Sequence, residues 1–181
     1  GMFSFALLDT NLDTLHLVRD PFGIKPLFYF FDNEKIWFAS EIKALLLIPG
    51  FEKQPDFESL HHYMSLGYIP GKLTAFSGIK ELEPGHRLII KRGDSKIEKI
   101  RYFAPKYDIN SSITEKDAIE HTEKLLLDSV SKQLVSDVPL GVMLSGGLDS
   151  SALVALMAKV RGDSNFHTFS LGFEEKSFDE S

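Results

Sequence analysis

Hydrophobic and polar positions alternate in short runs over the first hundred residues, and turn-forming residues separate these runs. A period of two is typical of β-strands that bury one face. Short runs joined by turns of this kind pair as antiparallel hairpins. The pattern predicts strands over residues 2–8, 14–19, 27–31, 35–39, 86–91 and 96–103.

Two short helices are predicted within this part of the chain. Ser40 can cap a helix that continues to residue 47, where Pro49 and Gly50 follow. Asp56 can cap a second helix over residues 57–66, which Gly67 would end. We therefore expect an α+β domain over residues 1–104, with antiparallel strands and two helices.

The pattern changes after this domain. Residues 105–114 are polar and lack periodicity, which indicates a domain boundary. Thr114 can cap a long helix that reaches about Val135. An apolar stripe on this helix is formed by Ile119, Leu126, Val130 and Leu134.

A strand over residues 140–144, a loop, a helix over 151–159 and a strand over 166–171 follow this long helix. Strand, helix and strand at this spacing predict a right-handed parallel crossover, and hence an α/β domain that begins near residue 114 and extends to 181. A single crossover cannot cover both faces of a parallel sheet, so we expect this second domain to be cut short.

The loop in this crossover carries the most specific chemistry in the chain. Residues 140–144 are apolar and uncharged, as in a strand buried on both faces, and Ser145, Gly146 and Gly147 interrupt them. Asp149 or Ser150 can cap the helix that follows. Glycines let backbone N–H groups turn toward a ligand, and a helix N-terminus adds unpaired N–H groups and a positive dipole end. The arrangement predicts a cradle for a phosphate or pyrophosphate.

This loop differs from two common phosphate-binding motifs. It lacks the lysine of the Walker-type loop and the glycine spacing of the dinucleotide-binding fingerprint. The alternative is a serine-rich turn that only caps a core helix. Five specified positions between a buried strand and a helix favour a phosphate site over this alternative.

Composition and charge exclude several classes of function. The chain has 181 residues, 43% of them hydrophobic, with a formal net charge of −6 and a pI near 5.5. This balance argues against nucleic acid as a partner. Neither a membrane-spanning run nor a secretory signal is evident, so a cytoplasmic location is the default expectation. There are no cysteines, which excludes disulfides, thiolate metal sites and a cysteine nucleophile among these residues.

Histidine and aromatic residues offer no further site. The six histidines show no metal-ligand spacing with a carboxylate, so we interpret them as structural or solvent-facing. The aromatic residues of the strands over 27–31 and 35–39 are interpreted as core rather than as a stacking surface for nucleic acid.

Several motifs in fixed order resemble one family. GMFSFAL (1–7), RDPFGIKPL (19–27), ASEIKAL (39–45) and LEPGH (82–86) resemble the latter half of a class II glutamine amidotransferase domain, which has an N-terminal-nucleophile-type fold. SDVPLG (136–141) and SGGLDSS (145–151) resemble the start of an N-type ATP pyrophosphatase domain. Together they are similar to glutamine-hydrolysing asparagine synthetase and its relatives.

The resemblance implies a reaction and its substrates. In this family a cysteine releases ammonia from glutamine, ATP adenylylates the aspartate β-carboxylate, and ammonia displaces AMP from β-aspartyl-AMP to give asparagine. Glutamine, aspartate and ATP are then the small-molecule partners, with ATP and Mg²⁺ as the cofactors, and a homodimer is left open.

The resemblance also implies roles for individual residues. From the sequence alone, Asp20 and Arg19 are better explained as a surface ion pair in a loop. The resemblance reverses this preference, because Asp20 matches the carboxylate that holds the α-amino group of glutamine. Leu144 and Leu171 match contacts to the adenosine, while the pyrophosphate loop is matched by Ser145, Gly146, Gly147, Asp149 and Ser150. Asp149 is also the expected Mg²⁺ contact, since magnesium usually binds through one or two carboxylates plus phosphates.

The chain departs from the family at both ends. The cysteine nucleophile and most glutamine contacts would precede Gly1, and the residues that bind aspartate would follow Ser181. We therefore expect a portion of a larger enzyme or a partial copy of its gene. Two alternatives stay open: a relative that amidates another acceptor, such as a β-lactam-forming or natural-product synthetase, and a non-catalytic module that retains only the nucleotide loop.

Overall fold

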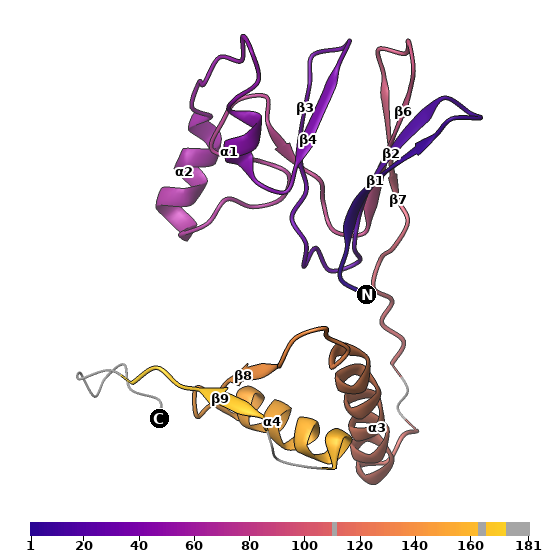
Figure 1. Cartoon of the computed structure of the whole chain (residues 1–181), viewed down its shortest axis with the longest axis vertical. Helices are drawn as coiled ribbons and strands as arrows, with labels where there is room; N and C mark the ends of the chain where they lie inside the picture. Colours follow the sequence, from indigo (N-terminus) through magenta and orange to yellow (C-terminus); the bar gives the residue numbers. More distant parts are fainter. Residues whose placement is uncertain (110–111, 163–165, 173–181) are drawn as a thin grey trace. The chain divides into compact units, whose positions relative to one another are not determined.

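The chain forms two compact units in a computed structural model, Gly1–Tyr107 and Asp108–Ser181, and the two are described separately (Figure 1). The structure describes residues 1–109, 112–162 and 166–172. Within these residues, no helix has the length and apolar character needed to cross a membrane.

The first unit contains a four-stranded antiparallel sheet in the order β1-β2-β6-β7. Its strands are β1 (Ser4–Asp9), β2 (Thr14–Arg19), β6 (His86–Lys91) and β7 (Ile97–Arg101). The β1–β2 turn is tight because the Asp9 carboxylate accepts hydrogen bonds from the backbone N–H groups of Asn11 and Leu12. Both predicted hairpins of this sheet are confirmed.

A second, three-stranded antiparallel sheet has the order β4-β3-β5. It consists of β3 (Phe28–Phe31), β4 (Ile36–Ala39) and β5 (Lys80–Glu81). The β3–β4 hairpin is as predicted, with Asn33 at a φ of 75° in its turn. The sequence did not predict β5, because two residues are too few to show an alternating pattern.

The two helices of this unit differ in how their ends are formed. Helix α2 (Phe57–Leu66) is as predicted: the Asp56 side chain accepts from the Ser59 N–H, and Gly67 ends the helix at a φ of 77°. Helix α1 (Ile42–Leu45) is shorter than predicted, and its cap residue is Glu41, which makes no side-chain capping bond. The predicted Ser40 cap is therefore wrong.

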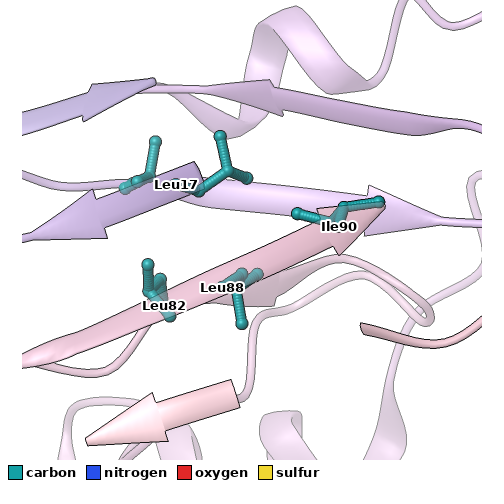
Figure 2. Packing of buried hydrophobic residues seen from close by; sticks show 5 residues of the cluster. Leu17, Leu82, Leu88 and Ile90 are labelled. Carbon is teal, nitrogen blue, oxygen red and sulfur yellow. The ribbon is translucent and has the colours of Figure 1, made fainter. Parts of the chain in front are cut away.

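The core of the first unit is a cluster of aliphatic side chains from both sheets and their flanking segments (Figure 2). Leu17 and Leu88 are both 0% exposed and lie directly opposite each other in the β2–β6 pairing. Figure 2 shows them with Leu82 and Ile90, and Leu27 completes the buried set. This packing holds together the segments on either side of Arg19 and Asp20.

The second unit begins with α3 (Glu115–Gln133), whose Thr114 side chain accepts from the Asp117 N–H as predicted. The strands β8 (Gly141–Met143) and β9 (His167–Phe169) flank α4 (Leu148–Arg161). They pair in parallel, with Val142 opposite Thr168, so the predicted parallel pairing of the two strands is confirmed.

Burial in the second unit differs from the sequence prediction. Val130, Val142 and Met157 form its core, whereas Ile119 on the predicted stripe is 60% exposed. Strand β8 is buried on one face only, since Met143 is 62% exposed. The predicted burial of this strand on both faces is wrong for the described chain, because β9 is the only described strand that pairs with it.

Candidate functional site: the loop between β8 and α4

The loop that follows β8 enters helix α4 without a side-chain cap. Gly146 adopts a φ of 80°, which favours glycine, and Gly147 is the N-cap residue at a φ of −69°. The prediction that Asp149 or Ser150 caps the helix is wrong, because both lie in its first turn. A glycine N-cap has no side chain of its own to accept from the first N–H groups of the helix.

The Ser150 hydroxyl is the centre of the hydrogen bonds within the loop. It donates to the Gly147 carbonyl at 3.1 Å and accepts from the Ser145 N–H at 3.2 Å. The two serine hydroxyl oxygens are also 3.2 Å apart, and the Ser145 hydroxyl accepts from the Gly147 N–H at 3.4 Å. These bonds fix the shape of the loop, so both hydroxyls would have to exchange partners to donate to a phosphate.

Strand β9 fixes the start of the loop. The Leu144 N–H donates to the Phe169 carbonyl at 2.8 Å, and the Ser170 hydroxyl donates to the Leu144 carbonyl at 2.6 Å. Leu144 is partly buried, and Leu171, which follows Ser170 in the sequence, is 70% exposed. The structure thus brings the two predicted adenosine contacts to the same end of the strand pair, with the Leu144 N–H already in use.

Backbone donors are what the loop leaves available. Within the described part of the chain, the N–H groups of Gly146, Leu148 and Asp149 have no hydrogen-bond partner, whereas the Ser151 N–H closes the first turn on the Gly147 carbonyl. N–H groups at a helix N-terminus attract anions through their orientation and through the helix dipole. The loop can therefore accept a phosphate group on its exposed side.

Asp149 is an exposed carboxylate in the first turn of α4. No group of three or more acidic or histidine side chains gathers in the described residues to hold a metal ion without help. A single carboxylate suits Mg²⁺ only when phosphate oxygens supply other ligands. Asp149 is thus a side chain of the loop that could supply one ligand to a magnesium ion, and its metal role stays a prediction.

Asp20 belongs to the other unit and has a well-defined structural surrounding. It is 0% exposed. Its Oδ1 atom accepts from the N–H groups of Phe22 and Ile24 at 3.1 Å each, and Oδ2 accepts from the Lys25 N–H at 2.9 Å. The alternative of a surface ion pair with Arg19 is wrong, because the carboxylate instead organises the loop that follows it.

The Arg19 side chain does not pair with Asp20 but with other groups. Its guanidinium forms a 2.7 Å ion pair with Glu81 and donates to the carbonyls of Gly23 and Lys25. The Tyr102 hydroxyl donates to the Arg19 carbonyl. Arg19 and Asp20 thus connect β2, the loop over residues 20–25, β5 and the end of β7 into one buried junction.

The surroundings of Asp20 stabilise its charged form. Burial raises the pKa of its carboxyl, but hydrogen bonds from the N–H groups of Lys25, Ile24 and Phe22 outweigh this effect, and the pKa lies below its usual value of 3.8. A carboxylate that is fully buried and bonded to three N–H groups has little capacity left for an ammonium ligand. The predicted contact with glutamine stays a prediction, and this geometry favours a loop-organising role.

Comparisons with known proteins cover both units. Residues 1–103 match the glutamine amidotransferase domain family, and residues 121–181 match the asparagine synthase family. Glutamine-hydrolysing asparagine synthetase 1 of Bacillus subtilis is 38% identical over 99% of this chain. The chain belongs to the glutamine-hydrolysing asparagine synthetase family. Asparagine synthetase 3 of the same bacterium is 37% identical over 97% of the chain.

The chain spans 28% and 29% of the lengths of these two family members. Among solved structures, the glutamine phosphoribosylpyrophosphate amidotransferase from B. subtilis matches 92% of this chain and 32% of its own. Its identity is 16% and its TM-score 0.28, a likeness too low to support an argument.

Three features of these sites escaped the sequence interpretation. The hydrogen bond between the Ser145 and Ser150 hydroxyls, and the one from the Ser170 hydroxyl to the Leu144 carbonyl, depend on side-chain directions that no local pattern encodes. The partners of Arg19 beside Asp20 are Glu81 and Tyr102, which are distant in sequence. The only available signal was the loop itself, where a carboxylate precedes Pro21 and Gly23, as in turns closed by an aspartate.

Proposed function

We propose that the chain forms part of an asparagine synthetase that uses glutamine as its ammonia source. Residues 1–104 would be the C-terminal portion of a class II amidotransferase domain with an N-terminal-nucleophile-type fold. Residues 114–181 would be the N-terminal portion of an ATP pyrophosphatase domain. The aspartate β-carboxylate attacks the α-phosphorus of ATP, pyrophosphate leaves, and ammonia then displaces AMP to give asparagine.

The observation that carries this proposal is the loop between β8 and α4, where the N–H groups of Gly146, Leu148 and Asp149 have no partner among the described residues. These donors are suited to the phosphates of ATP, and Leu144 and Leu171 lie where β8 and β9 end, beside the loop. Ligands of parallel α/β sheets bind at the carboxyl ends of the strands, which is where this loop is found. Asp149 would hold Mg²⁺ against the phosphates, since a bare carboxylate repels them.

Gly147 offers a clean test, because its φ of −69° suits any residue and an added Cβ would meet only the Ser145 hydroxyl oxygen, at 3.4 Å. Gly147→Val should therefore leave the fold intact while its side chain fills space in front of the helix. The assay uses a hybrid in which this chain replaces the matching segment of B. subtilis asparagine synthetase 1, and follows pyrophosphate release with and without aspartate.

The hybrid should release pyrophosphate only with aspartate, and Gly147→Val should abolish this release. Asp149→Ala should weaken ATP use and remove its dependence on magnesium concentration, with Asp137→Ala as a control at an exposed aspartate outside the loop. Unchanged magnesium dependence in Asp149→Ala would refute the metal role. Release that requires a different acid would identify another acceptor, and nucleotide binding without any release would indicate a non-catalytic module.

A further inference from the structure

A cavity of about 410 Å³ lies within the first unit, lined by residues of both sheets. Its lining contains three lysines, Lys72, Lys80 and Lys99, and no carboxylate. The other polar residues of the lining are Tyr29, Asn33 and Ser95. A cavity with this lining is unexpected in a chain whose net charge is −6.

Two of these lysines are on the core-facing sides of the sheets. Lys99 lies opposite Leu88 in the β6–β7 pairing, and opposite residues in a sheet share a face. Leu88 is 0% exposed in the core, so Lys99 is on the inner face of its sheet. Lys80 lies opposite Tyr29, which packs against the same core. The two edge strands β5 and β7 thus each direct a lysine toward the space between the sheets.

The charges around the cavity are only partly compensated. Glu83 is the nearby carboxylate, and it pairs with Lys99 at 2.7 Å. In the described residues, Lys72 and Lys80 have no ion-pair partner. Burial raises the pKa of Tyr29, and the charge of Glu83 raises it further, so the hydroxyl keeps its proton and remains a donor. Every charged group of the lining is therefore a cation, and the tyrosine adds a neutral hydrogen-bond donor.

We propose that this cavity, lined by Lys72, Lys80, Lys99 and Tyr29, binds a small phosphate-bearing anion. Lysines bind phosphate as point charges, whereas carboxylates are usually held by the planar fork of arginine, which this lining lacks. The volume suits a small metabolite rather than a macromolecule. The site shares no residue with the loop between β8 and α4, so its occupancy can be measured separately.

Inorganic pyrophosphate serves as the probe, added to the ¹⁵N-labelled 181-residue chain at low salt and followed through assigned amide shifts. We expect shifts at Asn33, Lys72, Lys80 and Lys99 that saturate together, apart from any shifts at Gly146 and Gly147. Lys72→Gln/Lys80→Gln should weaken this binding about tenfold or more at low salt, because two of the three cations of the lining are lost. Lys53→Gln/Lys91→Gln removes the same charge from equally exposed lysines that do not line the cavity, and should change the affinity less than twofold.

The alternative is that the lysines only protect the edges of β5 and β7 from pairing with another chain. In that case the Lys72→Gln/Lys80→Gln chain would self-associate in sedimentation while pyrophosphate affinity at the cavity stayed unchanged, and the proposal would be overturned. Equal losses in both double variants would show diffuse surface attraction and overturn it too. Tighter binding of succinate than of pyrophosphate would show that the ligand class is wrong.

Discussion

Replacement of Asp20 by asparagine separates its two assigned roles, loop organisation and contact with glutamine. Asn keeps one oxygen for the N–H groups of Phe22 and Ile24, but its NH₂ group would face the Lys25 N–H, now 2.9 Å from Oδ2. Hydrogen bonds to a charged group contribute about 1.5–3 kcal/mol each, and one is lost while the others become neutral. We expect Asp20→Asn to lower the free energy of unfolding by about 2–3 kcal/mol.

Urea unfolding followed by tryptophan fluorescence measures this change in the first unit alone. The chain has one tryptophan, Trp37 in β4, and it lies in the same unit as Asp20. With a typical urea slope, the loss lowers the midpoint by about 1 M. Asp13→Asn is the matched control, because the Asp13 carboxylate forms an exposed ion pair with Arg92 and an exposed pair contributes about 0–1 kcal/mol.

The pH dependence gives an independent check. The pKa of Asp20 is lowered on folding, so its stabilisation is fully present above the unfolded pKa and is lost as the pH falls through the folded value. The stability gap between wild type and Asp20→Asn should thus be constant above about pH 4 and shrink below it. Other carboxyls whose pKa is lowered, such as those of Asp32 and Asp56, contribute equally to the stability of both proteins, so their contributions cancel in the difference.

Two results would refute the structural role of Asp20. One is an Asp20→Asn variant that is as stable as the wild type at every pH measured. The other is a fully stable variant whose hybrid enzyme needs more glutamine for half-maximal ammonia release, which would identify Asp20 as a glutamine contact.

Three further predictions test other parts of the fold. Gly85→Ala should destabilise the first unit by about 2–4 kcal/mol, because its φ is 66° and a Cβ would approach the Phe103 carbonyl oxygen to 2.8 Å; Gly93→Ala, with a φ of 78° in open space, should cost about 1 kcal/mol in urea unfolding. Gly141→Ala should weaken amide protection at His167 and Phe169 in hydrogen exchange, since its Cβ would lie 2.5 Å from the Phe169 ring; unchanged protection would contradict the β8–β9 pairing. The 181-residue chain should release no ammonia from glutamine above a mock preparation, because it contains no cysteine nucleophile.

Elements with long local patterns were predictable from the sequence. The caps of α2 and α3 at Asp56 and Thr114 were found because the side chain that caps a helix is adjacent to it. The parallel pairing of β8 and β9 was predictable from chain connectivity, since a helical connection of this length is typical of parallel strands. These features depend on residues that are neighbours in the sequence.

Features that depend on distant residues were not predictable. Strand β5 exists because Lys80 and Glu81 pair with Tyr29 and Phe28, not because of their own propensity. The exposure of Met143 depends on which strands pair with β8, which the apolar run itself does not reveal. Gly147 is the N-cap residue in place of Asp149 or Ser150 because the helix begins at Leu148, which puts both predicted caps inside its first turn.

The two candidate sites also differ in whether their residues are close together in the sequence. The loop between β8 and α4 is continuous in sequence and could be found from its motif. The lysine cavity brings together residues 72, 80 and 99 from a loop and from strands of two different sheets, and no sequence pattern connects them.

The measurement that most directly tests the central claim is an amide-shift titration of the 181-residue chain with magnesium and a non-hydrolysable α,β-methylene analogue of ATP. The largest shifts should occur at Gly146, Gly147, Leu148 and Asp149, and Gly147→Val should remove them while the rest of the spectrum is unchanged. If these amides do not move at millimolar nucleotide while the second unit remains folded, the loop is a structural turn and the account of the ATP site is wrong.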